Sequence, residues 1–213
     1  MKRMILIVVL CVAALGVVLF VQQSRKSEAK GGVIEAIEAR RSIRKYSDKS
    51  VEREKLQKIA ECGVAAPSAM NSQDWELRIV DSKAWIDECT AIFVEQIQGT
   101  PTGDKMLTPD FKNMFRNAPA VIFVAAKGDA YSDLNAGLLG ENMMLAAYEL
   151  GLGTCCLGMP LMVLNEHHPK GKEKLASLGF SEGYRLRYAL AVGYADEAPE
   201  AKRRDLSKIR FVE

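Results

Sequence analysis

The chain has 213 residues, of which 48% are hydrophobic, so it is long enough for one domain with a sizeable core and is unlike a disordered or fibrous chain. Its 29 basic and 27 acidic residues leave a net charge of +2, which gives no reason to expect a nucleic-acid partner. The five cysteines include no CxxC pair, and His167-His168 lacks a partner at metal-ligand spacing, so neither a disulfide framework nor a metal site is predicted.

The first 32 residues are predicted to form a membrane segment and tether. Residues 4–21 are apolar and uncharged behind two basic residues, and a polar stretch follows. Such a run is long for the core of a signal peptide and just long enough to span a bilayer, which favours an uncleaved anchor in a bacterial inner membrane. Cleavage after Ala29 and lipidation of Cys11 remain as alternatives. Basic residues are similar in number on both sides, so the side on which the domain lies stays open.

Residues 33–213 are predicted to form one domain that mixes helices and strands. Helical spacing of apolar residues begins at residue 33 and again at Ser50, where the second pattern is ended by Pro67. A further helix is predicted over residues 83–98, followed by a mobile surface segment over 98–109 that suits a lid. Strands are predicted over residues 75–80, 120–126 and 188–194.

The helix predicted over residues 134–150 is apolar or small nearly all round. In a small domain, a helix covered on every face is often covered on one of them by a partner subunit, so a dimer is expected. The strands do not alternate regularly with the helices along the chain. This pattern favours an α+β sandwich over a doubly wound sheet.

Four segments carry residues suited to a ligand. Arg40-Arg41-Ser42-Ile43-Arg44 offers guanidinium groups and a hydroxyl that suit a phosphate, although a solvated basic face is the alternative for this segment taken by itself. Residues 66–73, Ala-Pro-Ser-Ala-Met-Asn-Ser-Gln, offer donors and acceptors on a stiff turn. Residues 151–160, Gly-Leu-Gly-Thr-Cys-Cys-Leu-Gly-Met-Pro, would let backbone amides approach a flat ligand. Lys202-Arg203-Arg204 is by default a charged tail.

Together, in this order, the four segments resemble the nitroreductase family of FMN flavoproteins, and the resemblance runs from about residue 33 to the C-terminus. It implies a three-layer sandwich with a central, mostly antiparallel sheet flanked by helices. It also implies a homodimer with FMN at the subunit interface, NAD(P)H as co-substrate and a small-molecule acceptor.

The resemblance assigns roles residue by residue. Arg40 and Ser42 would contact the FMN phosphate and ribityl oxygens, and Arg44 would lie near the pyrimidine end of the ring. The loop at 67–73 would come from the other subunit, and Leu157 and Gly158 would offer a backbone amide near flavin N5. The full set of predicted cofactor-binding residues is Arg40, Arg41, Ser42, Arg44, Pro67, Ser68, Ala69, Asn71, Gln73, Leu157, Gly158, Lys202 and Arg203.

The chain also departs from the family pattern. Asp74 stands where the family usually has a proline, which changes the stiffness of the loop and adds a charge. The family's basic residue before the strand at 120–126 has only Lys112 and Arg116 as candidates. The C-terminal register is open by one residue, so Arg204 is the alternative to Arg203.

The function implied is FMN-dependent transfer of reducing equivalents from NAD(P)H to an organic acceptor such as a nitroaromatic or a quinone. No side chain is predicted to act as a catalytic acid or base, because the flavin supplies the chemistry and the protein supplies orientation and electrostatics. The alternative is a non-catalytic, membrane-tethered module that binds a nucleotide or another anion. The sequence does not choose the acceptor, or between NADH and NADPH.

Overall fold

The computed structural model describes residues 32–128 and 130–212. Ala39–Glu213 form one compact unit. The helices and strands are, in chain order, α2 (Val33–Ala39), α3 (Arg53–Val64), the 3-10 turn η1 (Ala69–Asn71), β1 (Trp75–Val80), α4 (Lys83–Ile97), α5 (Pro101–Met106), β2 (Ala120–Ala126), α6 (Ser132–Glu149), β3 (Gly153–Leu157), α7 (Pro160–Val163), α8 (Pro169–Ala176), β4 (Arg185–Gly193) and the 3-10 turn η2 (Leu206–Lys208).

A four-stranded sheet in the order β1-β2-β4-β3 lies at the centre of this unit, and every neighbouring pair is antiparallel. Strand β2 is wholly buried, as expected for a continuous apolar run between two partners. Its register places Val124 opposite Leu77 of β1 and opposite Tyr188 of β4. The expected central strand and antiparallel sheet are confirmed.

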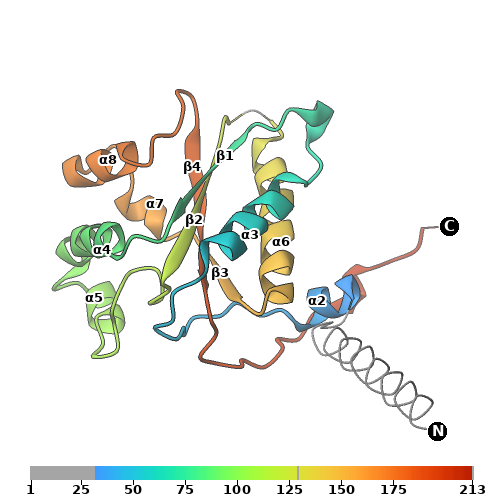
Figure 1. Ribbon diagram of the computed structural model, residues 1–213, viewed down its shortest axis with the longest axis horizontal. Helices are drawn as coiled ribbons and strands as arrows, with labels where there is room; N and C mark the ends of the chain where they lie inside the picture. Colours follow the sequence, from blue (N-terminus) through green and yellow to red (C-terminus); the bar gives the residue numbers. More distant parts are fainter. Residues whose placement is uncertain (1–31, 129, 213) are drawn as a thin grey trace, which may run out of the picture. The chain divides into compact units, whose positions relative to one another are not determined.

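Helices cover both faces of the sheet, and two apolar cores result (Figure 1). Helices α3 and α6 pack on the face that carries Ile122 and Val124. Helices α4, α5, α7 and α8 lie on the other face, where Val121 and Phe123 are buried. Successive side chains of a strand point to opposite faces, so one short apolar strand serves both cores. The α+β sandwich is therefore confirmed.

Helix α6 packs closely on α3 and leaves its opposite face exposed. A side chain at Gly63 of α3 would meet Met143 Cγ at 2.5 Å, so glycine allows this close approach. On the exposed face, Leu134 and Leu138 retain 59% and 40% of their accessible surface. The helix is therefore not covered on all sides within one chain, and its burial by a second subunit stays a prediction.

Two segments differ from the expectations. Residues 98–109 contain helix α5, which Thr100 caps by accepting a hydrogen bond from Gly103 N, with Pro101 at the first helical position. Proline and threonine are common in loops, but at these positions they are signals for the start of a helix. Residues 153–157 form edge strand β3, which the sequence did not predict, and Gly153 in this strand allows a second segment to approach closely.

The predicted membrane segment has no support in the structure. Residues 4–21 lie outside the described residues, and within 32–128 and 130–212 no helix has the length and apolar character needed to cross a bilayer. The fold class is corrected accordingly to the α+β sandwich alone, and the predicted location at a bacterial membrane is withdrawn.

Candidate functional site

The basic segment at residues 40–44 lies along the edge of the sheet. Ile43 N donates a hydrogen bond of 2.9 Å to Thr154 O, and Ser42 bridges Thr154 of β3 in parallel orientation. Gly153 makes this approach possible, because a Cβ atom there would meet Ile43 Cγ1 at 2.6 Å. The first and third of the predicted ligand segments are thereby brought together, although they are more than 100 residues apart in the chain.

The arginines of this segment are held by carboxylates and backbone oxygens. Arg40 Nε donates to Glu141 Oε1 of α6 at 3.0 Å. Arg44 Nη1 donates to Ser42 O at 3.0 Å, and its backbone N–H donates to the Glu197 carboxylate. Arg41 Nη1 donates to Arg40 O at 2.8 Å. These contacts fix the cationic groups beside the edge strand, where they can meet an anion.

Arg116 is a further cation at this place. Burial raises the pKa of the Cys155 thiol in β3, and the positive charges of Arg44 and Arg116 oppose that shift, so both guanidinium groups act on the same strand. Arg116 has a φ of 60°, in the left-handed region. Lys112, the other candidate, forms an ion pair with Asp48, with 2.5 Å between Lys112 Nζ and Asp48 Oδ1. Arg116 thus acts electrostatically on β3, whereas Lys112 is paired with Asp48, and the role of either as a cofactor contact stays a prediction.

The end of β3 faces open space on one side. Leu157 is buried, whereas Gly158 is exposed and a Cβ atom there would meet nothing within 4 Å. Cys156 points to the opposite face of the strand from its two buried neighbours and is exposed. A flat ligand could thus approach the backbone at Gly158 without a clash.

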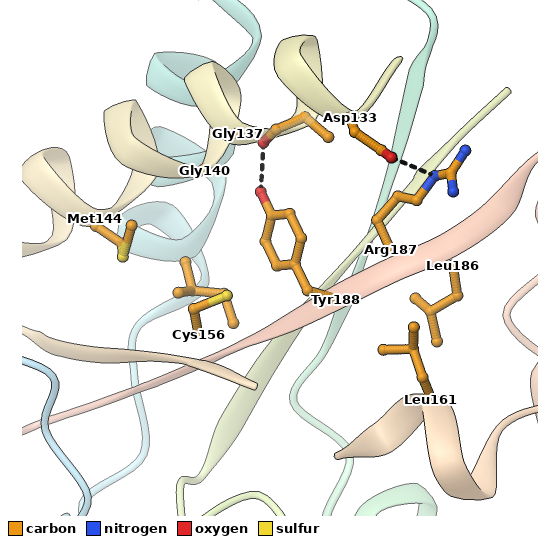
Figure 2. A pocket seen from close by; sticks show the side chains of 11 residues that line it. Asp133, Gly137, Gly140, Met144, Cys156, Leu161, Leu186, Arg187 and Tyr188 are labelled. Carbon is orange, nitrogen blue, oxygen red and sulfur yellow. Dashed lines mark hydrogen bonds and ion pairs between the residues drawn. The ribbon is translucent and has the colours of Figure 1, made fainter. Parts of the chain in front are cut away.

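A cavity of about 480 Å³ lies between α6, the ends of β3 and β4, and α7. Figure 2 shows Tyr188 and Arg187 reaching from β4 toward α6, with Cys156 of β3 beside them. Tyr188 Oη donates to Ala136 O at 2.8 Å, and burial raises the pKa of this phenol, so it stays protonated. Arg187 Nε lies 3.2 Å from Asp133 Oδ1, at ion-pair distance. Leucine, methionine and glycine form most of the remaining wall, which suits a ring-shaped organic ligand.

The loop at residues 67–73 lies elsewhere. Ala69 N donates to Asn135 Oδ1, so the loop is attached to the first turns of α6, while Arg40 pairs with Glu141 further along the helix. Six residues of helix correspond to about 9 Å. Figure 1 shows the loop between α3 and β1 at one end of α6, and the segment before α3 near the other end. Within one chain the two sets of predicted residues occupy different places.

The predicted C-terminal cations lie on an exposed tail. The segment leaves the sheet next to the basic segment, because Asp196 N donates to Lys45 O at 3.0 Å. Beyond it, Lys202 and Arg203 are exposed, and Arg204 Nη1 donates to Lys202 O at 3.1 Å. The structure does not bring these cations to Arg40. Among the described residues, no group of three His, Cys, Asp or Glu side chains is arranged to hold a metal ion.

Comparison with known proteins identifies the class. The model of the nitroreductase family matches residues 37–194. The chain therefore belongs to the nitroreductase family.

Individual relatives agree with this assignment. A protein of Archaeoglobus fulgidus named "Putative NADH dehydrogenase/NAD(P)H nitroreductase" is 30% identical over 76% of this chain and 84% of its own length. A protein of the same name from Methanothermobacter thermautotrophicus is 29% identical over 62% of this chain, but the match spans only 63% of that protein, less than two thirds. A solved nitroreductase with bound FMN from Desulfitobacterium hafniense superposes with a TM-score of 0.76 at 26% identity, covering 86% of this chain and all of the other.

Proposed function

We propose that the chain is an FMN-dependent oxidoreductase that takes reducing equivalents from NAD(P)H and passes them to a small organic acceptor such as a nitroaromatic or a quinone. The observation that carries this proposal is the docking of residues 40–44 on the start of β3, which sets cations along a strand whose other end is open at Gly158 and borders an apolar cavity at Cys156. The family assignment and the FMN-bound nitroreductases of similar fold support it.

The residues present fit the phosphate of FMN. Arg40 and Ser42 are the proposed ligands, because a guanidinium fork and a hydroxyl next to it donate several hydrogen bonds to phosphate oxygens. Arg41 adds positive charge to the same segment. Lys202 and Arg203 lie on an exposed tail without helix or strand, and we assign them to the phosphate as well, with Arg204 as the alternative to Arg203.

The residues present also fit the ring. The open space at Gly158 and the buried Leu157 before it leave the strand end accessible to a flat edge. Arg44 and Arg116 supply positive charge near this strand, and a cation beside the pyrimidine end stabilises the charge of a reduced flavin. FMN, when bound, supplies hydride acceptance from NAD(P)H and reduction of the acceptor. The chain itself binds the cofactor, orients it and tunes its electrostatic surroundings. No side chain is proposed as an acid or base.

The loop at 67–73 is assigned to the site of a second copy. It lies away from the arginines of its own chain, and the exposed apolar face of α6 offers a surface for a partner. In a two-fold symmetric dimer each chain would lend Pro67, Ser68, Ala69, Asn71 and Gln73 to the other's cofactor. We therefore propose a homodimer built from residues 33–213 with FMN at its interface.

Spectroscopy and turnover of the purified full chain test this function. A yellow protein with a flavin spectrum, or a colourless one that becomes yellow with FMN, is expected. Such a protein should oxidise NADH or NADPH in the presence of a quinone or a nitroaromatic compound. If the folded chain binds neither FMN nor riboflavin, the proposal is wrong and the alternative of a non-catalytic anion-binding module replaces it.

A further inference from the structure

The loop at residues 67–73 has an unfavourable backbone conformation. Met70, Asn71 and Gln73 have φ values of 53°, 53° and 45°, all in the left-handed region. That region is unfavourable for most L-residues, and asparagine tolerates it better than methionine or glutamine. The loop keeps this shape through hydrogen bonds within it, such as that from Gln73 N to Ser68 Oγ at 3.1 Å, and through contacts to the rest of the chain.

Asp74, the residue that stands in place of the family's usual proline, is at the centre of those contacts. It is charged but only 4% exposed. Its carboxylate accepts hydrogen bonds from Ser72 Oγ at 3.1 Å, from Asn135 Nδ2 at 2.7 Å and from the Ser132 hydroxyl. Three donors thus converge on one buried group.

These donors connect Asp74 to the loop through α6. Asn135, which donates to Asp74, accepts from Ala69 N with its own Oδ1 at 3.1 Å, so the amide is fixed at both ends. Ser132 accepts from Gly128 N at 3.0 Å, which ties the start of α6 to the end of β2. The loop is therefore held to the sheet and to α6 by one polar network.

A carboxylate suits this place better than the other short polar groups. It accepts at both oxygens and has no donor of its own, whereas an amide at residue 74 would present an N–H group to a donor. The same reasoning fixes which way the side-chain amide of Asn135 is oriented, because its Nδ2 must donate to Asp74 and its Oδ1 must accept from Ala69 N.

We propose that Asp74 is a positioning residue for cofactor binding, which acts through Asn135 and Ser132 to hold the loop at 67–73 in the shape that receives the partner's cofactor. This inference rests on the proposed function, because the loop is assigned to the cofactor there.

A charge-swap series on the full chain tests the proposal. The variants are Asp74→Asn, Asn135→Asp and the double variant with both changes. The first weakens the acceptor, and the second sets two carboxylates side by side. The double variant restores one carboxylate and one amide in exchanged places, with an acceptor still available to Ala69 N. Thr90→Val is the matched control, since it removes a buried acceptor of Met114 N on the other face of the sheet.

FMN titration, FMN dissociation rate and apoprotein melting temperature are measured for each variant. Both single variants are expected to weaken FMN binding about ten- to a hundredfold, the range for disturbing a buried hydrogen-bonded group. The double variant should recover most of that loss. Thr90→Val should lower the melting temperature with little change in FMN affinity. If a single variant does not fold, Ser132→Ala replaces it as the milder disturbance.

Equal FMN affinity in wild type, Asp74→Asn and Asn135→Asp would overturn the proposal. The proposal would also be overturned if Thr90→Val lost FMN affinity in the same proportion to its loss of melting temperature as Asp74→Asn and Asn135→Asp do. Asp74 would then act only through stability. A wild-type chain that binds no flavin would instead overturn the proposed function, so the two failures are distinguishable.

Discussion

Replacing Arg40 with alanine tests whether the basic segment binds phosphate. In the structure this guanidinium uses Nε to bind Glu141 at 3.0 Å, and the two side chains are 25% and 42% exposed. A partly exposed pair of this kind contributes roughly 0–1 kcal/mol to folding. The melting temperature of the apoprotein should therefore hardly change when Arg40 is removed.

The effect on FMN should be much larger. A hydrogen bond to a charged group contributes about 1.5–3 kcal/mol, so Arg40→Ala should weaken FMN binding roughly ten- to a hundredfold. Riboflavin, which lacks the phosphate, should bind both proteins nearly equally. Removing Arg40 also leaves the charge of Glu141 uncompensated near the phosphate. The double variant Arg40→Ala/Glu141→Gln separates that repulsion from the loss of the guanidinium.

Fluorescence titration of the apoprotein with FMN and with riboflavin measures both affinities, since flavin emission changes on binding. The assignment is wrong if Arg40→Ala weakens FMN and riboflavin by the same factor, or weakens neither. Parallel titrations of Arg203→Ala and Arg204→Ala decide the C-terminal register, because only the true phosphate ligand should show an FMN-specific loss.

Four further outcomes are expected. Light scattering of the FMN-loaded protein should give about twice the chain mass of 23.5 kDa, and a monomeric mass would refute the shared site. Arg116→Ala should lower the flavin reduction potential by about 30 mV, whereas Lys112→Ala should leave it unchanged in redox titration. Alkylation of the exposed Cys156 should slow when FMN is added; equal rates by mass spectrometry would place the cofactor elsewhere. Burial alone would raise the pKa of Asp74, but hydrogen bonds from Ser132, Asn135 and Ser72 outweigh it and lower the pKa. Its contribution to stability is therefore complete above the unfolded-state value of about 4 and is lost as pH falls through the lower folded value. Below pH 4, the melting temperature should therefore fall more steeply with decreasing pH for the wild type than for Asp74→Asn.

The fold could be predicted from the sequence where one signal dominates. Residues 120–126 are a continuous apolar run, and they form the buried central strand. The strand at residues 153–157 is hidden in the sequence because the glycines around it resemble a loop, and the reason for Gly153 is tertiary: it receives Ile43 from a segment over 100 residues earlier. No local pattern contains that information.

The site could be predicted as a set of segments but not as an arrangement. The order of the four motifs identifies the family, and the docking of residues 40–44 on β3 unites two of them. Arg116 and Lys112 look alike in the sequence, and they differ only in the folded arrangement, where Asp48 engages Lys112 while Arg116 acts at Cys155. The roles of the loop and of the C-terminal cations stay predictions.

Helix α6 shows why composition misses part of the site. Its apolar residues dominate the sequence pattern and indicate a packing helix, which they form against α3. Its few polar residues hold the predicted ligand segments: Asn135 and Ser132 hold Asp74 and the loop, and Glu141 holds Arg40. A polar side chain on an otherwise apolar helix must have partners when buried, and those partners lie in distant segments. Buried polar exceptions on such a helix are therefore a signal in the sequence itself, and here Ser132 and Asn135 lead to Asp74.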